Sequence, residues 1–369
     1  MKIEFKREDF IDSLQIVNKA IKKGNLYPIL DCVLIDASKN KIILTAQDGK
    51  EVTIKKEAIG EILEKGKAAI DANSLLDYVR SMPEDSFIEL SINDKKESFI
   101  KCGDKIKMEI QVKDETTYPN IININKDNKI IINEMKLKKA LEKVIFSYDK
   151  TQETGNVVLK GIYFNINKDK FQVKSMDGYI ISIVNELINN DNKYETIVPG
   201  TAIEELYRLL KGEVNKDAYI YFNDKNIAFE FNDTLLTSII IPNKYIDTDR
   251  IFNIEYNTKV NVNKENLINS LRRSITMLRE NDNKPVILDI KEDKIFVNLN
   301  SLSGNFSEEI NIKKTGKELM IAFNARNLIK ILNVIEDENV ELYFSGAKQP
   351  LVIKDKQETY SYLLTPVKI

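Results

Sequence analysis

The stretch "AFNARNLIKILNVIEDENVELYF", residues 322–344, is the third occurrence of one pattern in this chain. It predicts the end of a strand, a short amphipathic helix, an acidic turn and a further strand. The same pattern begins at Ile70 ("IDANSLLDYVRSMPEDSFIELSI") and at Val198 ("VPGTAIEELYRLLKGEVNKDAYIYF"). Equivalent apolar positions in the three helices, 128 and then 125 residues apart, are occupied by Leu75, Ile203 and Leu328. Repeats of this length are whole domains.

Each repeat begins with a strand that runs into an earlier helix: "IEFKREDFIDSLQIV" from Ile3, "IIINEMKLKKALEKV" from Ile130 and "VNVNKENLINSLRRS" from Val260. Two positions four residues apart face the same side of each helix. They hold Phe10, Leu137 and Leu267, and then Leu14, Leu141 and Leu271. Between the helices, alternating segments surround polar turns at 38–41, 167–170 and 291–294. The pattern predicts α+β domains at residues 1–125, 126–250 and 251–369, each with two helices on an antiparallel sheet.

Composition narrows the classes of function. The chain of 369 residues has 43% apolar and 30% charged residues, and its net charge is −2. It has no histidine, which removes the commonest general base and the commonest metal ligand. No apolar run approaches the roughly 20 residues that span a bilayer, so we expect a cytoplasmic protein without membrane contact. The separated Cys32 and Cys102 predict buried thiols, and we expect no cofactor or metal.

Composition leaves at least two classes of function open, an enzyme and a structural scaffold. A hydrolase would need two carboxylates roughly 5 to 9.5 Å apart in one cleft, and no acidic pair stands out from the repeat. A structural scaffold that binds no nucleic acid is the other alternative. The segment "GEILEKGKA" from Gly60 resembles a phosphate-binding loop, but it has five residues between its glycines and Ala68 follows the lysine. The sequence therefore does not favour nucleotide binding.

The segment "NLYPILDCVLIDASKNKIILTAQDGKEVTI" from Asn25 resembles the N-terminal signature of bacterial β sliding clamps, the processivity subunits of DNA polymerase III. Further similarities are "TYPNI" from Thr117, "LKGIYF" from Leu159, "MDGYIIS" from Met176 and the terminal "YLLTPVKI". The order and spacing of these motifs cover the whole chain. The chain differs from the usual pattern at Tyr179 and Ile180, where the family commonly has histidine and arginine.

The resemblance implies a non-enzymatic DNA sliding clamp that acts in DNA replication. Three clamp domains per chain would form a ring as a head-to-tail homodimer, with helices lining a hole for double-stranded DNA. A clamp loader would open the ring. The DNA polymerase III alpha subunit and other proteins would dock through short clamp-binding peptides. A divergent paralogue clamp, or a scaffold with weakened DNA or partner binding, is the alternative.

Three groups of site residues follow from the resemblance. The peptide pocket would be lined, between the second and third domains, by Leu159, Met176, Gly178, Tyr179, Ile181, Pro242, Ile246, Leu363, Thr365 and Pro366. Basic residues on or beside the helices would contact DNA phosphates, namely Lys22, Lys23, Arg80, Lys139, Lys143, Arg208, Arg272 and Arg273. The head-to-tail interface would bring together basic-apolar and acidic-apolar surfaces formed by Lys105, Lys107, Met108, Ile110, Met277, Leu278, Glu308 and Glu309.

Overall fold

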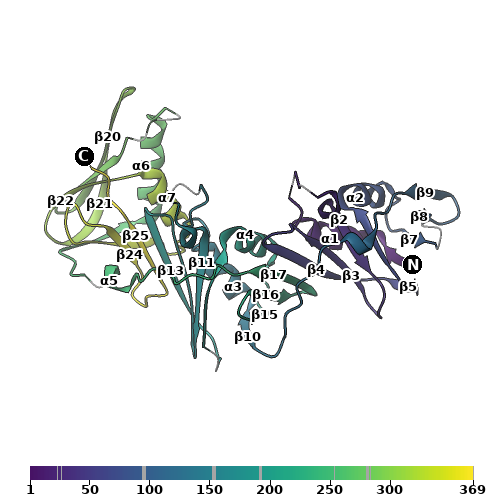
Figure 1. The fold of residues 1–369 in the computed structure, drawn as a ribbon. Helices are drawn as coiled ribbons and strands as arrows, with labels where there is room; N and C mark the ends of the chain where they lie inside the picture. Colours follow the sequence, from purple (N-terminus) through teal and green to yellow (C-terminus); the bar gives the residue numbers. More distant parts are fainter. Residues whose placement is uncertain are drawn as a thin grey trace. The chain divides into compact units, whose positions relative to one another are not determined.

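The fold is taken from a computed structural model that describes residues 1–22, 24–25, 27–93, 97–151, 155–190, 193–252, 254–279, 282 and 284–368. The longer helices come in pairs, one pair in each repeat (Figure 1). They are α1 (Arg7–Asn18) and α2 (Ala72–Ser81), α3 (Glu134–Glu142) and α4 (Gly200–Leu209), and α6 (Lys264–Thr276) and α7 (Ala325–Asn333). A short helix, α5 (Asp249–Phe252), precedes the third repeat. None of the described helices is long and apolar enough to cross a membrane.

The strands form three antiparallel sheets. In spatial order, the first contains β5 (Glu61–Glu64), β1 (Lys2–Lys6), β7 (Phe87–Ile92), β8 (Ser98–Cys102) and β9 (Ile106–Ile110). In the same sense, the second contains β10 (Lys129–Asn133), β15 (Asp217–Phe222), β16 (Asn226–Phe231), β17 (Thr234–Ile239), β4 (Val52–Ala58), β3 (Ile42–Gln47), β2 (Cys32–Asp36) and β6 (Lys67–Asp71). The third contains β14 (Lys193–Pro199), β11 (Gly161–Asn167), β12 (Lys170–Met176), β13 (Ile180–Leu187), β25 (Tyr360–Leu364), β24 (Leu351–Lys354), β23 (Asn339–Phe344), β18 (Thr258–Asn263), β21 (Gly304–Gly316), β20 (Lys294–Ser301), β19 (Val286–Ile290) and β22 (Leu319–Phe323).

The first and second repeats each divide their strands between two sheets, all strands of the third repeat lie in the third sheet, and neighbouring repeats share a sheet. β17 of the second repeat pairs with β4 of the first, from Thr234 opposite Lys56 to Ser238 opposite Val52. β25 of the third repeat pairs with β13 of the second in the same antiparallel manner. The sheets therefore continue across both junctions between repeats, which the sequence pattern alone did not specify.

The predicted helix faces form the cores. Phe10, Leu137 and Leu267, their partners four residues on, and Leu75, Ile203 and Leu328 are all 0% exposed. Three of the helices begin at side-chain caps, which satisfy N–H groups that lack an intrahelical acceptor. Asp71 accepts from the Ser74 N–H, Asn263 from the Asn266 N–H, and Asn324 from the Arg326 and Asn327 N–H groups.

The chain divides into two compact units that do not follow the three repeats. One unit contains residues 1–135 and 204–240, and the other contains residues 136–203 and 241–369. Each unit surrounds one of the two shared-sheet junctions, because strand pairing concentrates contacts there. The domain boundaries at residues 125 and 250 consequently remain a prediction from the repeat.

Both cysteines are free. Cys32 is fully buried, as predicted, whereas Cys102 is only half-buried at the end of β8. The segment that resembles a phosphate-binding loop forms β5 and the start of β6. A phosphate-binding loop leads directly into a helix, so this geometry also disfavours that interpretation of Gly60–Ala68.

Candidate functional site

An apolar cluster lies beside the β13–β25 junction in the second unit. It contains the buried side chains of Val158, Leu159, Met176, Ile197 and Tyr245, against which Tyr163, Ile181 and Ile241 pack. Leu363 of β25 lies opposite Ile181 of β13 in the strand register. Apolar residues from the second repeat and from the segment that leads into the third repeat thus meet at one place. This arrangement suits the burial of apolar side chains of a ligand.

Two stacked tyrosines form the aromatic part of this cluster. The rings of Tyr163 and Tyr245 lie 4.7 Å apart with an interplanar angle of 10°. The Tyr163 hydroxyl donates to Glu195 Oε2 at 2.7 Å. Burial raises the pKa of Tyr245, and its hydroxyl has no hydrogen-bond partner among the described residues. An unpaired buried hydroxyl favours a ligand group that can hydrogen-bond to it.

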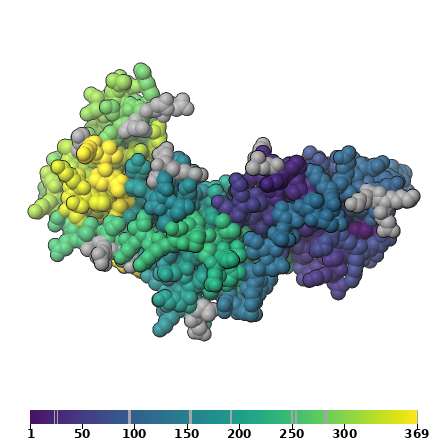
Figure 2. All heavy atoms as spheres, in the orientation of Figure 1, coloured from purple at the N-terminus to yellow at the C-terminus, as the bar shows by residue number. Residues whose placement is uncertain are grey.

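The turn before β13 is held by its own aspartate and by the C-terminal segment. Asp177 Oδ1 accepts from the N–H groups of Tyr179 and Ile180, while Gly178 adopts a φ of 91°. The Thr365 N–H and hydroxyl both donate to the Tyr179 carbonyl, at 2.9 and 3.2 Å. Figure 2 shows the yellow atoms of the C-terminal segment at the surface of this unit. The "MDGYIIS" motif therefore has a structural role, and it presents a Tyr179 side chain that is 60% exposed.

The predicted pocket residues divide into those that form the floor of this region and those at its surface. Leu159, Met176 and Leu363 are at most 6% exposed, so large substitutions there would disturb the core. The half-buried or exposed members are Gly178, Tyr179, Ile181, Pro242, Ile246, Thr365 and Pro366. The members of the cluster that the sequence did not predict are Val158, Tyr163, Ile197, Ile241 and Tyr245. Strand alternation around "LKGIYF" and "ETIVP" could have placed Tyr163 and Ile197 together on the face opposite the fully buried Ile162 and Val198, but their meeting with Tyr245 depends on the fold.

The predicted DNA-binding residues lie on or just after the helices, and most already have a partner in the same chain. Lys22 pairs with the buried Asp48 at 2.6 Å, and Lys139 pairs with Glu336 at 3.0 Å. Arg208 pairs with Glu205 at 2.6 Å. A DNA phosphate would have to compete with these carboxylates for the cations.

The remaining predicted DNA-binding residues differ in whether another side chain already contacts their charged group. Lys143 Nζ lies 5.7 Å from the centroid of the Tyr360 ring, and Arg272 donates to Asn333 Oδ1 at 3.3 Å. Arg273 makes a two-pronged ion pair with Glu308. Arg80 is exposed in the last turn of α2, and its guanidinium has no partner among the described residues. The prediction for Lys23 falls outside the described residues.

Several strands in the described part of the chain are paired on one side only, and two such edges lie where the other repeats form a shared-sheet junction. β9 pairs only with β8, and Gly304–Asn311 of β21 pairs only with β20. In the order of strands, β9 takes the place that β17 and β25 take in the other repeats, and β21 takes the place of β4 and β13. Lys107, Met108, Ile110, Glu308 and Glu309 lie on these two edges, and Lys105 directly precedes β9. Met277 and Leu278 directly follow α6, which packs against β21.

The two predicted interface glutamates point to opposite faces of β21, because neighbouring residues in a strand alternate. Glu308 pairs with Arg273 of α6, whereas Glu309 pairs with Lys294 of β20 at 3.0 Å. On β9, Met108 is half-buried and Ile110 is buried, while Lys107 is exposed with its ammonium 3.8 Å from the centroid of the Phe99 ring. Lys107 and Glu309 are both exposed, so Glu309 is a better candidate than Glu308 to pair with Lys107 in a contact between two chains.

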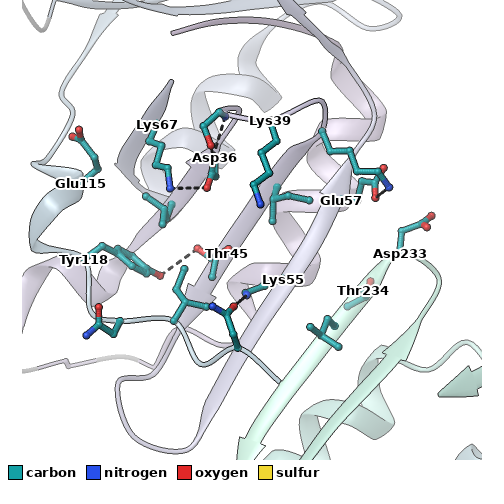
Figure 3. Close-up of a pocket in the computed structure, with 18 of the residues that line it drawn as sticks. Asp36, Lys39, Thr45, Lys55, Glu57, Lys67, Glu115, Tyr118, Asp233 and Thr234 are labelled. Atoms are coloured by element: carbon teal, nitrogen blue, oxygen red, sulfur yellow. Dashed lines mark hydrogen bonds and ion pairs between the residues drawn. The ribbon is translucent and has the colours of Figure 1, made fainter. Parts of the chain in front are cut away.

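A separate polar hollow of about 1230 Å³ lies in the first unit. Its lining residues Ile43 and Thr45 alternate along β3 with the fully buried Leu44 and Ala46, so the hollow covers the sheet face opposite that core. Tyr118, from the segment after β9, forms one wall and donates to the Thr45 carbonyl at 3.2 Å (Figure 3). The described residues contain no group of three or more acidic, cysteine or histidine side chains that could hold a metal ion.

Three family models together match almost the whole chain. The DNA polymerase III beta subunit N-terminal, central and C-terminal domains match residues 1–122, 131–247 and 249–368. The chain belongs to the DNA polymerase III beta subunit family. Its three consecutive matches account for the threefold repeat, and the structure has the three-domain clamp fold.

Known beta subunits and sliding clamps match over the full length of the chain. A crystal structure of a putative DNA polymerase III beta subunit from Eubacterium rectale is 32% identical, with a TM-score of 0.95 and complete coverage of both chains. A beta sliding clamp from Staphylococcus epidermidis is 26% identical over 100% of this chain and 99% of its own length. A DNA polymerase sliding clamp from Bacillus subtilis is 22% identical with a TM-score of 0.95, covering 100% of this chain and 99% of its own.

Family membership confirms the predicted fold class and the non-enzymatic nature of this beta subunit homologue. The family is one of processivity factors that take part in DNA replication with DNA polymerase III. The hydrolase alternative is therefore set aside.

Proposed function

We infer that this chain is a DNA sliding clamp that confers processivity on a DNA polymerase. The observation that carries the inference is the pair of shared-sheet junctions between repeats, together with the two unpaired edges at the equivalent places of the first and third repeats. A contact of the same kind between two chains would satisfy both edges. Two such contacts close a head-to-tail dimer, and closed symmetric assemblies are the rule for homo-oligomers.

The proposed contact pairs β9 of one chain with the Gly304–Asn311 half of β21 in the other, antiparallel as at both internal junctions. Met108 and Ile110 would then lie near Met277 and Leu278 at the end of α6. Lys105 and Lys107 would face Glu309, which could exchange its partner Lys294 for a lysine of the second chain. Backbone pairing supplies affinity, and the charged side chains supply register and orientation.

Weak contacts to DNA suit a protein that is held by topology. Among the predicted cations, Lys22, Lys139, Arg208 and Arg273 are already paired with carboxylates, which explains how a chain of net charge −2 can still carry basic helices. Such pairs are partly replaceable by phosphates, and exposed contacts are screened beyond roughly 8 Å at physiological salt. We propose Arg80 as the strongest single phosphate contact, because no carboxylate among the described residues competes for it.

Polymerase and loader peptides would bind at the apolar cluster beside the β13–β25 junction. The exposed Tyr179 and Ile246 and the half-buried Ile181 and Pro366 would form the walls, above the floor of Leu159 and Met176. Burying two large apolar peptide side chains is worth roughly 3 to 6 kcal/mol before ordering costs. We therefore expect micromolar affinity for such peptides, which suits partners that exchange on one clamp in the cytoplasm.

A primer-extension assay tests the proposed function. On singly primed circular DNA, with the cognate polymerase, clamp loader and ATP, the protein should lengthen the products of a single binding event. A scaffold that does not support the polymerase would leave the product length unchanged. The control is the chain with Ile246→Asp, which should still form a dimer but give shorter products.

A further inference from the structure

The polar hollow in the first unit is lined by several lysines that differ in their partners. Its lining lysines Lys41, Lys67 and Lys126 each have a carboxylate partner, with Glu57, Asp36 and Glu230 at 2.6, 2.8 and 2.6 Å. Lys55 of β4 and the exposed Lys39 and Lys65 have no such partner among the described residues, and of these three Lys55 alone is half-buried. Its ammonium donates only to the neutral Asn123 Oδ1, at 3.3 Å.

The surroundings of Lys55 disfavour its protonated form relative to the neutral amine. Burial lowers the pKa of Lys55, the nearby Lys126 lowers it further, and only Asp36 acts in the opposite direction. By contrast, the hydrogen bond and charge of Glu57 raise the pKa of Lys41. At neutral pH a larger fraction of Lys55 than of Lys41 is therefore the neutral amine, which is the nucleophilic form.

The geometry also leaves Lys55 within reach of a small reagent. Figure 3 shows Lys39 and Lys55 extending into the hollow, while Lys67 turns toward Asp36. The hollow, at about 1230 Å³, is large enough for a small acyl donor. The amide oxygen of Asn123 accepts one N–H and leaves the lone pair of a neutral amine free to attack.

We propose that Lys55 is a site of acylation by small acyl phosphates. The neutral Nζ attacks the acyl carbon, the carbon–oxygen bond to phosphate breaks, and inorganic phosphate leaves with the electron pair. The nitrogen gives up one proton to water or to the departing phosphate. The amide product keeps one N–H to donate to Asn123 Oδ1, and it removes a half-buried charge that lacked a counter-ion.

The test is acetylation of the full-length protein by acetyl phosphate at pH 8, with each lysine quantified over time by peptide mass spectrometry. We expect Lys55 to react about threefold or more faster than Lys41 and Lys67, which line the same hollow but are ion-paired. In the urea-denatured chain this lead should vanish. A smaller ratio in the folded protein would overturn the proposal, as would rates that follow exposure alone, with Lys39 and Lys65 fastest and Lys55 slowest.

A second variant separates the electrostatic cause from general access to the hollow. Asn123→Asp places a carboxylate beside Lys55 while keeping the size of the side chain. We expect its Lys55 to react at the rate of Lys41, with the rates of Lys41 and Lys67 unchanged. An unaltered Lys55 rate in this variant would show that the missing counter-ion is not the cause and would overturn the proposal.

Discussion

Leu278 offers the sharpest perturbation of the proposed ring. It lies just after α6 and is half-buried in the single chain, so an aspartate there can be solvated as long as the chain is alone. In the proposed dimer the side chain is buried in both contacts. Burying a fully exposed leucine is worth about 1.5 to 3 kcal/mol, and each contact gains about half of this because Leu278 is already half-buried. A ring contains the contact twice, which makes about 1.5 to 3 kcal/mol, so Leu278→Asp should raise the dimer dissociation constant by about 10 to 10².

Sedimentation equilibrium from nanomolar to micromolar concentration measures this change. The desolvation of an unpaired carboxylate adds to the loss, so the range is a lower bound. Leu187→Asp is the matched control, since Leu187 is 74% exposed at the end of β13, on neither of the unpaired edges. The control should dimerise like the parent chain. A Leu278→Asp protein with parental fold and a dissociation constant within about threefold of the parent would refute the proposed contact.

Three further predictions concern DNA, pH and the peptide site. Arg80→Glu should weaken DNA binding and reduce the number of counterions released on binding by about one to two. Arg208→Glu, at the equivalent position, should have less effect because Arg208 is already paired with Glu205. A salt titration of DNA binding, followed by fluorescence anisotropy, measures both changes. Burial acts to raise the pKa of Asp48, but Lys22 and three backbone N–H groups outweigh it and hold the pKa below its usual value. The stability that the Asp48 carboxylate contributes is therefore present at neutral pH and is lost as the pH falls below about 4. In denaturant titrations, Asp48→Asn should lower the free energy of unfolding at neutral pH, and this difference from the parent should shrink toward acid pH. Ile246→Asp should weaken a clamp-binding peptide at least about tenfold in calorimetry without lowering the melting temperature, because its side chain is 40% exposed; equal affinity would place the groove elsewhere.

The sequence predicted the features that depend on local periodicity. Phe10, Leu137 and Leu267 occupy the same helical position in the three repeats, and each has an apolar residue four positions later. Residues four apart lie on the same face of a helix, and this apolar face is buried in every repeat. The Asp–Gly pairs at Asp48 and Asp177 could also have predicted turns, since an aspartate can accept from the N–H groups that follow it.

The features that depend on long-range geometry were not predictable from pattern. The Lys22–Asp48 and Arg273–Glu308 pairs join residues from separate elements, and they place an internal carboxylate beside each of these two predicted DNA contacts. Tyr245 joins the apolar cluster through the fold rather than through any repeat. The β4–β17 junction likewise has no signature, because any two strands with compatible edges can pair.

Retention on circular compared with linear DNA tests the central claim most directly. The protein is labelled, assembled on a singly nicked circular plasmid with a clamp loader and ATP, and separated from free protein by gel filtration; half of the sample is then cut once with a restriction enzyme. A clamp that encircles DNA should elute with the circle and leave the linear molecule through its ends, at a salt concentration that abolishes ordinary binding. Equal retention on circular and linear DNA would contradict the account, because it would show that surface contacts, not topology, hold the protein.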